Sequence, residues 1–284
     1  MKEDFTSPIS FIKGKFAINN QAKISIFDLG FTRSYGVFEF LRTYNLKPFL
    51  LEDHLQRLFK SAKILGIKHN FKFNYLKKLI FTLIKKNKHL KSELNIRIFL
   101  TGGESHDFLF SQKPNLYILI TPLKKLPESY YSKGVKIITK NFHRDFPQAK
   151  SLNYSMLIKF LKEAKRKKAT EVLLVNNQEI LEGATSNFFA VIKGRVITPP
   201  SNKILEGITR KFILHLLKKY RFPYQERKLL ISEIKDFQEC FLTATNKEIL
   251  PVVQIDNFKI NNGKPGIITL KLRELFYKET NERH

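Results

Sequence analysis

Cysteine is nearly absent from this chain, whose 284 residues include only Cys240. One cysteine excludes an intrachain disulfide and a zinc site made of clustered cysteines, and it favours a reducing compartment. Long apolar runs are also missing, because no stretch approaches the roughly 18 uncharged apolar residues of a membrane helix. The first residues lack the apolar region of a signal peptide. We therefore expect a cytoplasmic protein with no membrane partner and no metal site.

Acidic residues are scarce as well: 25 Asp and Glu stand against 51 Lys and Arg, which gives a formal net charge of +26. A basic surface attracts phosphates, so nucleic-acid binding is one interpretation of this excess. A solvated, lysine-rich surface is the other. We favour it because the excess covers both halves of the chain and no nucleic-acid motif accompanies it. We therefore expect no nucleic-acid partner, although the charge would favour anionic substrates.

Strand and helix patterns alternate along the chain, which predicts an α+β fold with two domains. Apolar spacing predicts helices over 51–65 and 75–86, and residues 171–176 have the composition of a strand. Alternation before and after Asn19 and Asn20 predicts a hairpin that turns there. The predicted parts are a small N-terminal domain over 1–121, a linker over 122–132 and a larger C-terminal domain over 133–284.

Four motifs in the second half carry the chemistry: A-K-S-L-N-Y at 149–154, L-E-G-A-T-S-N-F-F at 181–189, I-L-E-G-I-T-R at 204–210 and T-A-T-N-K-E-I-L-P-V at 243–252. They place Lys150 before a predicted helix, Glu182 after a strand, and a Gly-Ile-Thr-Arg turn at the start of another helix. Such a set can hold a phosphorylated aldehyde cofactor from three sides. A lysine at a buried helix end also loses solvation, which makes it useful as a nucleophile.

These motifs resemble those of the class IV, or fold type IV, pyridoxal-phosphate enzymes. That family includes branched-chain aminotransferases, D-amino-acid aminotransferases and aminodeoxychorismate lyases. The first half agrees through D-L-G-F at 28–31, Y-G-V-F-E-F-L-R at 35–42 and H-L-Q-R-L at 54–58, so the resemblance covers residues 20–275. It implies pyridoxal 5′-phosphate as the cofactor, a small α/β sandwich followed by a larger pseudo-barrel domain, and a homodimer.

The resemblance also implies roles for individual residues. Lys150 forms the aldimine with the cofactor, and Glu182 pairs with the pyridine nitrogen, so that the ring can act as an electron sink. Leu205 packs on the ring face, and Tyr154 reaches the phenolic oxygen of the cofactor. The residues implied at the phosphate are Arg57, Ile208, Thr209 and Thr245.

For the substrate, the resemblance points to Arg97, Phe31 and Ala244. Alternation places Arg97 on one strand face with Phe99, and we expect it to pair with a substrate carboxylate such as that of glutamate. An exposed strand arginine is the plain alternative. The sequence thus predicts an aminotransferase that moves an amino group from a branched-chain or related L-amino acid to a 2-oxo acid, 2-oxoglutarate.

Three other hypotheses stay open. A D-amino-acid aminotransferase has an arginine and a histidine two apart in the loop where this chain reads T-G-G-E-S-H-D-F, with His106 but no arginine. An aminodeoxychorismate lyase, which serves 4-aminobenzoate and folate synthesis, uses the same cofactor chemistry to eliminate pyruvate. A basic nucleic-acid-binding protein would hold no cofactor. Retention of Lys150, Glu182 and Arg57 argues against an inactive homologue.

Overall fold

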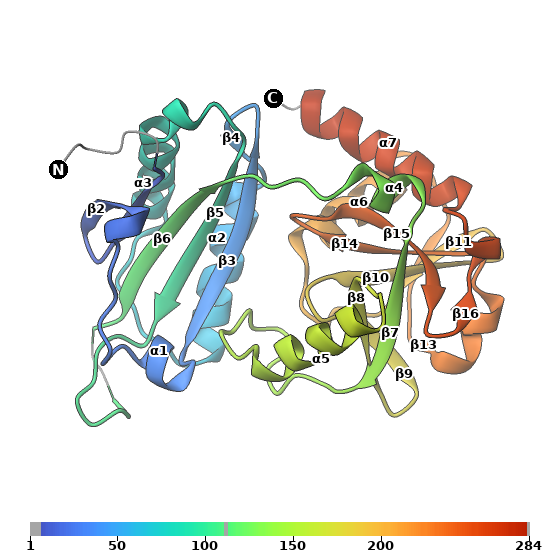
Figure 1. The fold of residues 1–284 in the computed structure, drawn as a ribbon, viewed down its shortest axis with the longest axis horizontal. Coiled ribbons are helices and arrows are strands. Elements are labelled where there is room, and N and C mark those ends of the chain that lie inside the picture. Colours follow the sequence, from blue (N-terminus) through green and yellow to red (C-terminus); the bar gives the residue numbers. More distant parts are fainter. Residues whose placement is uncertain (1–6, 111–112, 283–284) are drawn as a thin grey trace. The chain divides into compact units, whose positions relative to one another are not determined.

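The computed structural model describes residues 7–110 and 113–282, which form two compact units (Figure 1). Unit 1 contains residues 7–110, 113–124 and Ala149–Asn153, and unit 2 contains Lys125–Gln148 and residues 154–282. Each unit has its own sheet with helices packed on it, so the predicted α+β class is confirmed.

Unit 1 is built on a six-stranded sheet with the order β2-β1-β6-β5-β3-β4, in which all neighbours are antiparallel. Figure 1 shows its two longer helices on the same face of this sheet. The elements of unit 1 are β1 (Ile9–Ile12), β2 (Lys15–Ile18), α1 (Leu29–Arg33), β3 (Gly36–Tyr44), β4 (Lys47–Pro48), α2 (Leu51–Ile64), α3 (Phe73–Lys86), β5 (Leu94–Thr101) and β6 (Asn115–Pro122), with short 3-10 turns η1 (Asn19–Gln21) and η2 (Lys88–Leu90).

Strand alternation decides which face of the unit 1 sheet is covered. In β5, Ile96 and Ile98 are fully buried in the core that contains Leu55 and Leu58 of α2, whereas Arg97 between them points to the other face and is half-buried. The predicted helices are confirmed, because their apolar spacing matches this buried face.

The predicted turn at Asn19-Asn20 is wrong. The first hairpin turns at Lys13 and Gly14, whose φ angles of 46° and 88° suit a two-residue hairpin loop. Asn19 instead begins η1, and its side chain donates to the carbonyl of Ile120 at 2.7 Å. The side chain of Asn19, whose turn preference had predicted the hairpin loop, therefore makes a long-range contact with β6 instead.

The segment Ala149–Asn153 belongs to unit 1 because it extends the edge of β3. The Phe38 N–H donates to the carbonyl of Lys150 at 2.9 Å, and the Leu152 N–H donates to the carbonyl of Gly36 at 3.0 Å. A Cβ on Gly36 would lie 2.6 Å from the Leu152 side chain and 3.1 Å from the Leu100 carbonyl, so glycine suits this close approach. Hydrogen bonds to β3 thus fix the backbone on both sides of Ser151.

Unit 2 contains a ten-stranded sheet with the path β12-β11-β10-β14-β15-β7-β8-β9-β13, and β16 pairs with β15. Its strands and turns are β7 (Val135–Asn141), β8 (Glu171–Asn176), β9 (Glu179–Gly183), β10 (Asn187–Ile192), β11 (Arg195–Thr198), β12 (Tyr224–Glu226), β13 (Leu229–Leu230), η3 (Ile231–Asp236), β14 (Glu239–Ala244), β15 (Glu248–Ile255), β16 (Phe258–Lys259) and η4 (Asn261–Gly263). Its helices are α4 (Glu128–Ser132), α5 (Ser155–Arg166), α6 (Ile208–Lys219) and α7 (Ile267–Glu282).

Strand β8 shows how unit 2 buries this sheet on both faces. Val172 and Leu174 belong to one apolar cluster, which includes residues of α5, and Leu173 and Val175 belong to another. A strand covered on both faces gives the continuous apolar run V-L-L-V at 172–175, so the predicted strand over 171–176 is confirmed. Among the described residues, no helix is long and apolar enough to cross a membrane.

Candidate active site

Lys150 is held at the β3 edge of unit 1. Its N–H donates to the Ser61 hydroxyl of α2 at 3.1 Å, and its amine nitrogen lies 4.3 Å from the centroid of the Phe38 ring. An ammonium at this distance over an aromatic face is stabilised by the ring. The half-buried side chain is therefore placed by backbone and ring contacts within one unit.

Arg57 lies in a buried polar cluster with Glu39 and His54. The Arg57 Nε and Nη2 donate to the two carboxylate oxygens of Glu39 at 2.7 and 2.8 Å, and His54 Nδ1 lies 2.7 Å from the same carboxylate. Burial would raise the pKa of Glu39, but the charge and hydrogen bonds of Arg57, with those of His54, outweigh it and lower the pKa to about 2. Glu39 is therefore ionised at neutral pH.

Arg97 lies on the sheet face opposite α2 and α3. Its guanidinium is 4.8 Å from the Phe40 ring centroid, and its Nη1 donates to the Thr121 hydroxyl at 3.3 Å. Partial burial lowers the pKa of Arg97, yet an arginine keeps its charge. The stacked pair Phe38–Phe99 lies on the same face. This face thus joins aromatic surface to the positive charge of Arg97.

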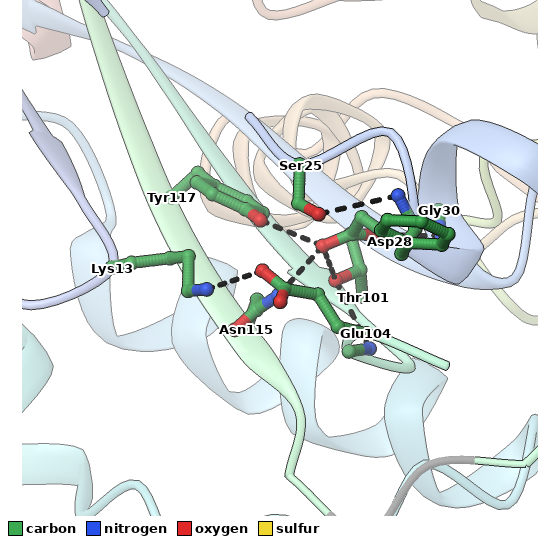
Figure 2. Close-up of polar contacts among 10 residues, drawn as sticks. Lys13, Ser25, Asp28, Gly30, Thr101, Glu104, Asn115 and Tyr117 are labelled. Carbon is green, nitrogen blue, oxygen red and sulfur yellow. Dashed lines mark hydrogen bonds and ion pairs between the residues drawn. The ribbon is translucent and has the colours of Figure 1, made fainter. Parts of the chain in front are cut away.

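Phe31 lies on α1 and is 65% exposed. Asp28 fixes its surroundings, because this buried carboxylate caps α1 and ties it to β5 and β6 (Figure 2). Burial and the hydrogen bond to Asp28 raise the pKa of Tyr117, so its hydroxyl stays a donor. The four donors to Asp28 are Gly30 N at 2.7 Å, Thr101 Oγ1 at 2.9 Å, Asn115 Nδ2 at 2.8 Å and the Tyr117 hydroxyl at 2.6 Å.

In unit 2, Glu182 is buried at the end of β9 and has partners at both oxygens. Arg144 Nε donates to Oε1 at 2.9 Å, and Arg144 Nη2 donates to the Ala184 carbonyl at 2.7 Å. At Oε2, the Leu205 N–H donates at 3.1 Å and the Asn187 amide at 3.4 Å. The structure thus brings two predicted residues, Glu182 and Leu205, into direct contact.

Arg144 is a candidate site residue that sequence reasoning missed, because its loop carries no periodic pattern. Its guanidinium carbon lies 5.3 Å from the centroid of the Tyr154 ring. Burial alone would lower the pKa of Arg144, but Glu182 and Tyr154 outweigh that effect and raise it. Arg144 therefore stays charged and links two residues that the sequence had selected separately.

The start of α6 has the features of an anion site. Gly207 is the N-cap, no side chain caps the helix, and its first turn holds no acid. Ile208 and Thr209 open the helix and are buried. A Cβ on Gly207 would lie 1.9 Å from the Asn187 side-chain oxygen, so any other residue would displace the buried Asn187 side chain. The first N–H groups and the dipole of this helix favour a phosphate.

Thr245 and Ala244 lie where β14 ends and turns into β15. Lys247 of the same turn forms a buried ion pair with Glu171, and its amine also donates to the Thr185 hydroxyl at 2.6 Å. Thr185 in turn donates to Glu171 at 2.6 Å. The ion pair ties the turn to β8, and the hydrogen bond to Thr185 ties it to the loop that follows Glu182. Sequence reasoning missed these contacts.

The donor groups of each unit fit a part of pyridoxal phosphate. Unit 1 offers the Lys150 amine for an aldehyde and the Arg57 guanidinium for a phosphate, and unit 2 offers the buried Glu182 carboxylate for a protonated ring nitrogen and the start of α6 for a phosphate. A family model described as amino-transferase class IV matches residues 36–255. The chain belongs to the class IV aminotransferases. The resemblance found in the sequence is thereby confirmed, and the chain is a pyridoxal-phosphate-dependent aminotransferase.

Known class IV aminotransferases resemble this one over nearly the whole chain. It is 29% identical over 272 residues to a D-alanine aminotransferase from Staphylococcus epidermidis, covering 94% of this chain and 96% of the relative. A putative branched-chain-amino-acid aminotransferase from Methanocaldococcus jannaschii is 33% identical over 278 residues, with 94% of each covered. A branched-chain aminotransferase from Thermoproteus uzoniensis, solved with norvaline, superposes with a TM-score of 0.88 at 26% identity. The match covers 98% of this chain and 96% of that structure's chain.

Class IV aminotransferases use pyridoxal phosphate and act on amino and oxo acids. The predicted activity class is therefore confirmed, whereas the relatives' names divide between D-alanine and branched-chain enzymes. The side chain and the stereochemistry of the amino acid remain predictions.

Proposed function

We propose that this aminotransferase moves an amino group from a branched-chain or related L-amino acid to 2-oxoglutarate, with Lys150 as the residue that attaches pyridoxal phosphate. The observation that carries the substrate class is the face of the unit 1 sheet on which Arg97 lies beside Phe40 and the stacked pair Phe38–Phe99. Aromatic surface suits an aliphatic side chain, and one guanidinium suits the second carboxylate of glutamate.

Each proposed site residue acts on a different part of the cofactor or the substrate. When bound, pyridoxal phosphate supplies an electron sink for the pair left as the substrate Cα loses its proton. Lys150 carries that proton as general base and acid. Glu182, kept in place by Arg144, holds the proton of the pyridine nitrogen, and Leu205 packs on the ring. The phosphate is held by Arg57, Ile208, Thr209 and Thr245, the phenolic oxygen by Tyr154, and the substrate also by Phe31 and Ala244.

A D-amino-acid aminotransferase is the second candidate, because a D-alanine aminotransferase is among the relatives. Against it stands the loop after Thr101, which has His106 and no arginine for the substrate carboxylate. Adding L-leucine, D-alanine or aminodeoxychorismate separately to the cofactor-loaded protein separates the candidates. We expect L-leucine to bleach the cofactor absorbance, and pyruvate release from aminodeoxychorismate would identify the lyase instead.

We also propose a homodimer. Unit 1 exposes large apolar side chains in two neighbouring segments, and contiguous apolar surface of this kind marks protein interfaces. The ring of Phe27 lies 4.5 Å from that of His106, which joins the two segments. The exposed residues are Ile24, Ile26, Phe31, Leu109 and Phe110.

A cytoplasmic location of the protein stays a prediction.

The decisive test of the cofactor proposal is at Lys150. Borohydride reduction of the cofactor-loaded protein, followed by digestion, is expected to add the cofactor mass to the peptide that contains this lysine. Lys150→Ala should keep the thermal stability of the fold, lose this label and lose nearly all turnover. Label on another peptide, or normal turnover in the variant, would overturn the proposal.

A further inference from the structure

We propose that Glu39 and His54 are positioning residues that hold the Arg57 guanidinium in one orientation and thereby set the preference of this enzyme for a phosphorylated cofactor. The inference rests on the proposed function, in which Arg57 binds the cofactor phosphate. It adds two buried residues that have no part in that function as stated so far, and it lies entirely within unit 1.

The contact between Glu39 and Arg57 fixes a plane as well as a distance. Nε and Nη2 of the guanidinium reach one carboxylate oxygen each, at 2.7 and 2.8 Å. Two parallel charge-assisted hydrogen bonds restrict rotation about the last bonds of the arginine side chain, which a single bond cannot do. Glu39 is fully buried and Arg57 is 9% exposed, so water competes little for these bonds.

His54 holds the carboxylate from the other side. Burial lowers the pKa of His54 even though Glu39 opposes this, so the imidazole is neutral at neutral pH. Since a carboxylate can only accept, the proton of the neutral ring lies on Nδ1 and donates to Glu39 at 2.7 Å. Glu39 thus receives donors from two residues of one helix, and its own position is fixed.

A purely structural role would not call for this histidine. His54 Nε2 is buried and has no hydrogen-bond partner among the described residues, which costs stability. The next helix positions that face the core hold Leu55 and Leu58, and both are fully buried. A third leucine would avoid the penalty at position 54. The imidazole is therefore present for its Nδ1–H bond to Glu39.

The spacing on α2 connects this cluster to Lys150. His54, Arg57 and Ser61 are three and four residues apart, so they lie on one face of the helix. Ser61 accepts the Lys150 N–H, and the charge of Lys150 contributes to the lowered pKa of His54. One helical face thus positions both the proposed phosphate ligand and the proposed attachment residue.

The experiment compares pyridoxal phosphate with pyridoxal, which lacks the phosphate, by titrating the cofactor-free protein and following absorbance. Glu39→Gln keeps the shape of the side chain but removes its charge and one acceptor. We expect it to weaken binding of pyridoxal phosphate about 10- to 100-fold, the usual worth of hydrogen bonds between charged groups. Binding of pyridoxal should change less than about twofold, because nothing but the phosphate contact is altered.

Variants of His54 supply a rescue test that does not depend on the folding of Glu39→Gln. His54→Leu removes the donor to Glu39, and we expect it to reduce the preference for pyridoxal phosphate several-fold. His54→Asn keeps an N–H donor near the place of Nδ1 and should restore most of that preference. Leu58→Ala, in the core on the same helix, is the matched control: it should lower stability and leave the ratio of the two affinities unchanged.

The outcomes separate the inference from the proposed function. Arg57→Ala measures the share of the preference for pyridoxal phosphate that this arginine supplies beside Ile208, Thr209 and Thr245. If the wild type binds neither compound, the proposed function fails, and if Arg57→Ala keeps the full preference, the proposed role of Arg57 at the phosphate fails. Only the positioning role fails if Arg57→Ala reduces the preference for pyridoxal phosphate while Glu39→Gln and His54→Leu keep that preference. The same holds if Glu39→Gln tightens the binding of pyridoxal phosphate. Equal weakening of both compounds would also overturn that role.

Discussion

Each unit of the molecule buries one glutamate against one arginine, but the two pairs are built differently. In unit 1, Arg57 contacts both oxygens of Glu39, and His54 adds a third donor. In unit 2, Arg144 contacts Oε1 of Glu182, and the donors to Oε2 are the neutral Leu205 N–H and the Asn187 amide. In our proposal the arginine meets the cofactor in the first pair and the glutamate in the second.

Comparing the two pairs shows how to recognise a residue that holds a candidate cofactor ligand in place. A buried ion pair adds little net stability, because desolvation of the charges offsets their attraction. Two such pairs in one chain therefore need a reason other than stability. In each pair, the candidate ligand is joined to a partner of opposite charge that fixes its position. The predictions below test this parallel, beginning with the largest effect.

Glu182→Gln should lower turnover with L-leucine about 10²- to 10⁴-fold, since a neutral amide cannot hold a proton on the pyridine nitrogen during proton transfer. The binding of pyridoxal phosphate should survive. Single-turnover absorbance measures the proton-transfer step directly. A rate within threefold of the wild type would mean that Glu182 takes no part in proton transfer. The Glu182–Arg144 pair would then not be comparable with the Glu39–Arg57 pair of unit 1.

Arg144→Met should lower the free energy of unfolding by about 3 to 5 kcal/mol, because it leaves the buried carboxylate of Glu182 without its cation. Arg144→Lys should recover part of this loss, since lysine restores the charge but not the planar contact. Urea unfolding measures both. If methionine at this position costs nothing, Arg144 is not the supporting partner of Glu182.

Lys247→Met should cost about 3 kcal/mol in the same assay, because Glu171 loses its cation but keeps donors from Thr185 and the Val172 N–H. The double variant with Glu171→Gln should recover most of this loss. Lys203→Met, at an ion pair with Glu179 whose lysine side chain is 49% exposed, is the control and should cost about 1 kcal/mol or less. Equal losses at the two lysines would contradict the role of burial.

Acid should act on unit 1 through Glu39. Its pKa is about 2 in the folded protein against an ordinary value of 4.5, so its contribution is present above pH 4.5 and is lost as the pH falls towards 2. The linked stability is about 3 kcal/mol at most. Unfolding of the wild type and Glu39→Gln should therefore differ at pH 7 and converge near pH 2. A difference that is constant with pH would mean that Glu39 keeps its ordinary pKa.

Local patterns in the sequence predicted much of the fold. The spacing of Leu55 and Leu58 indicates the buried face of α2, and the run at 171–176 indicates a strand covered on both faces. The hairpin turn was misplaced, because Asn19 has turn preference yet bonds to a strand that lies 101 residues away. Such contacts cannot be read from neighbouring residues.

The candidate site divides in the same way. Motifs selected Glu182 and Leu205, and the structure brings the two into contact. The supporting residues were not found: Arg144, which contacts Glu182, lies in a loop without periodicity, and His54, which contacts the Glu39 partner of Arg57, reads as one more polar residue on a helix. Only the folded chain shows that each of them contacts a carboxylate. Sequence thus points to groups that act on a cofactor, and tertiary structure is needed to find the groups that hold them.

The place of Lys150 at the edge of β3 has a consequence for biosynthesis. The serine that accepts its N–H precedes it by 89 residues. A nascent chain that ends at residue 124 therefore has all six strands of the unit 1 sheet but neither the lysine nor the backbone that bonds to Gly36 and Phe38. In such a chain, part of β3 would have unpaired N–H and C=O groups, and unpaired strand edges favour aggregation. The ribosome must therefore add residues 125–153, which include α4 and β7 of unit 2, before unit 1 is complete.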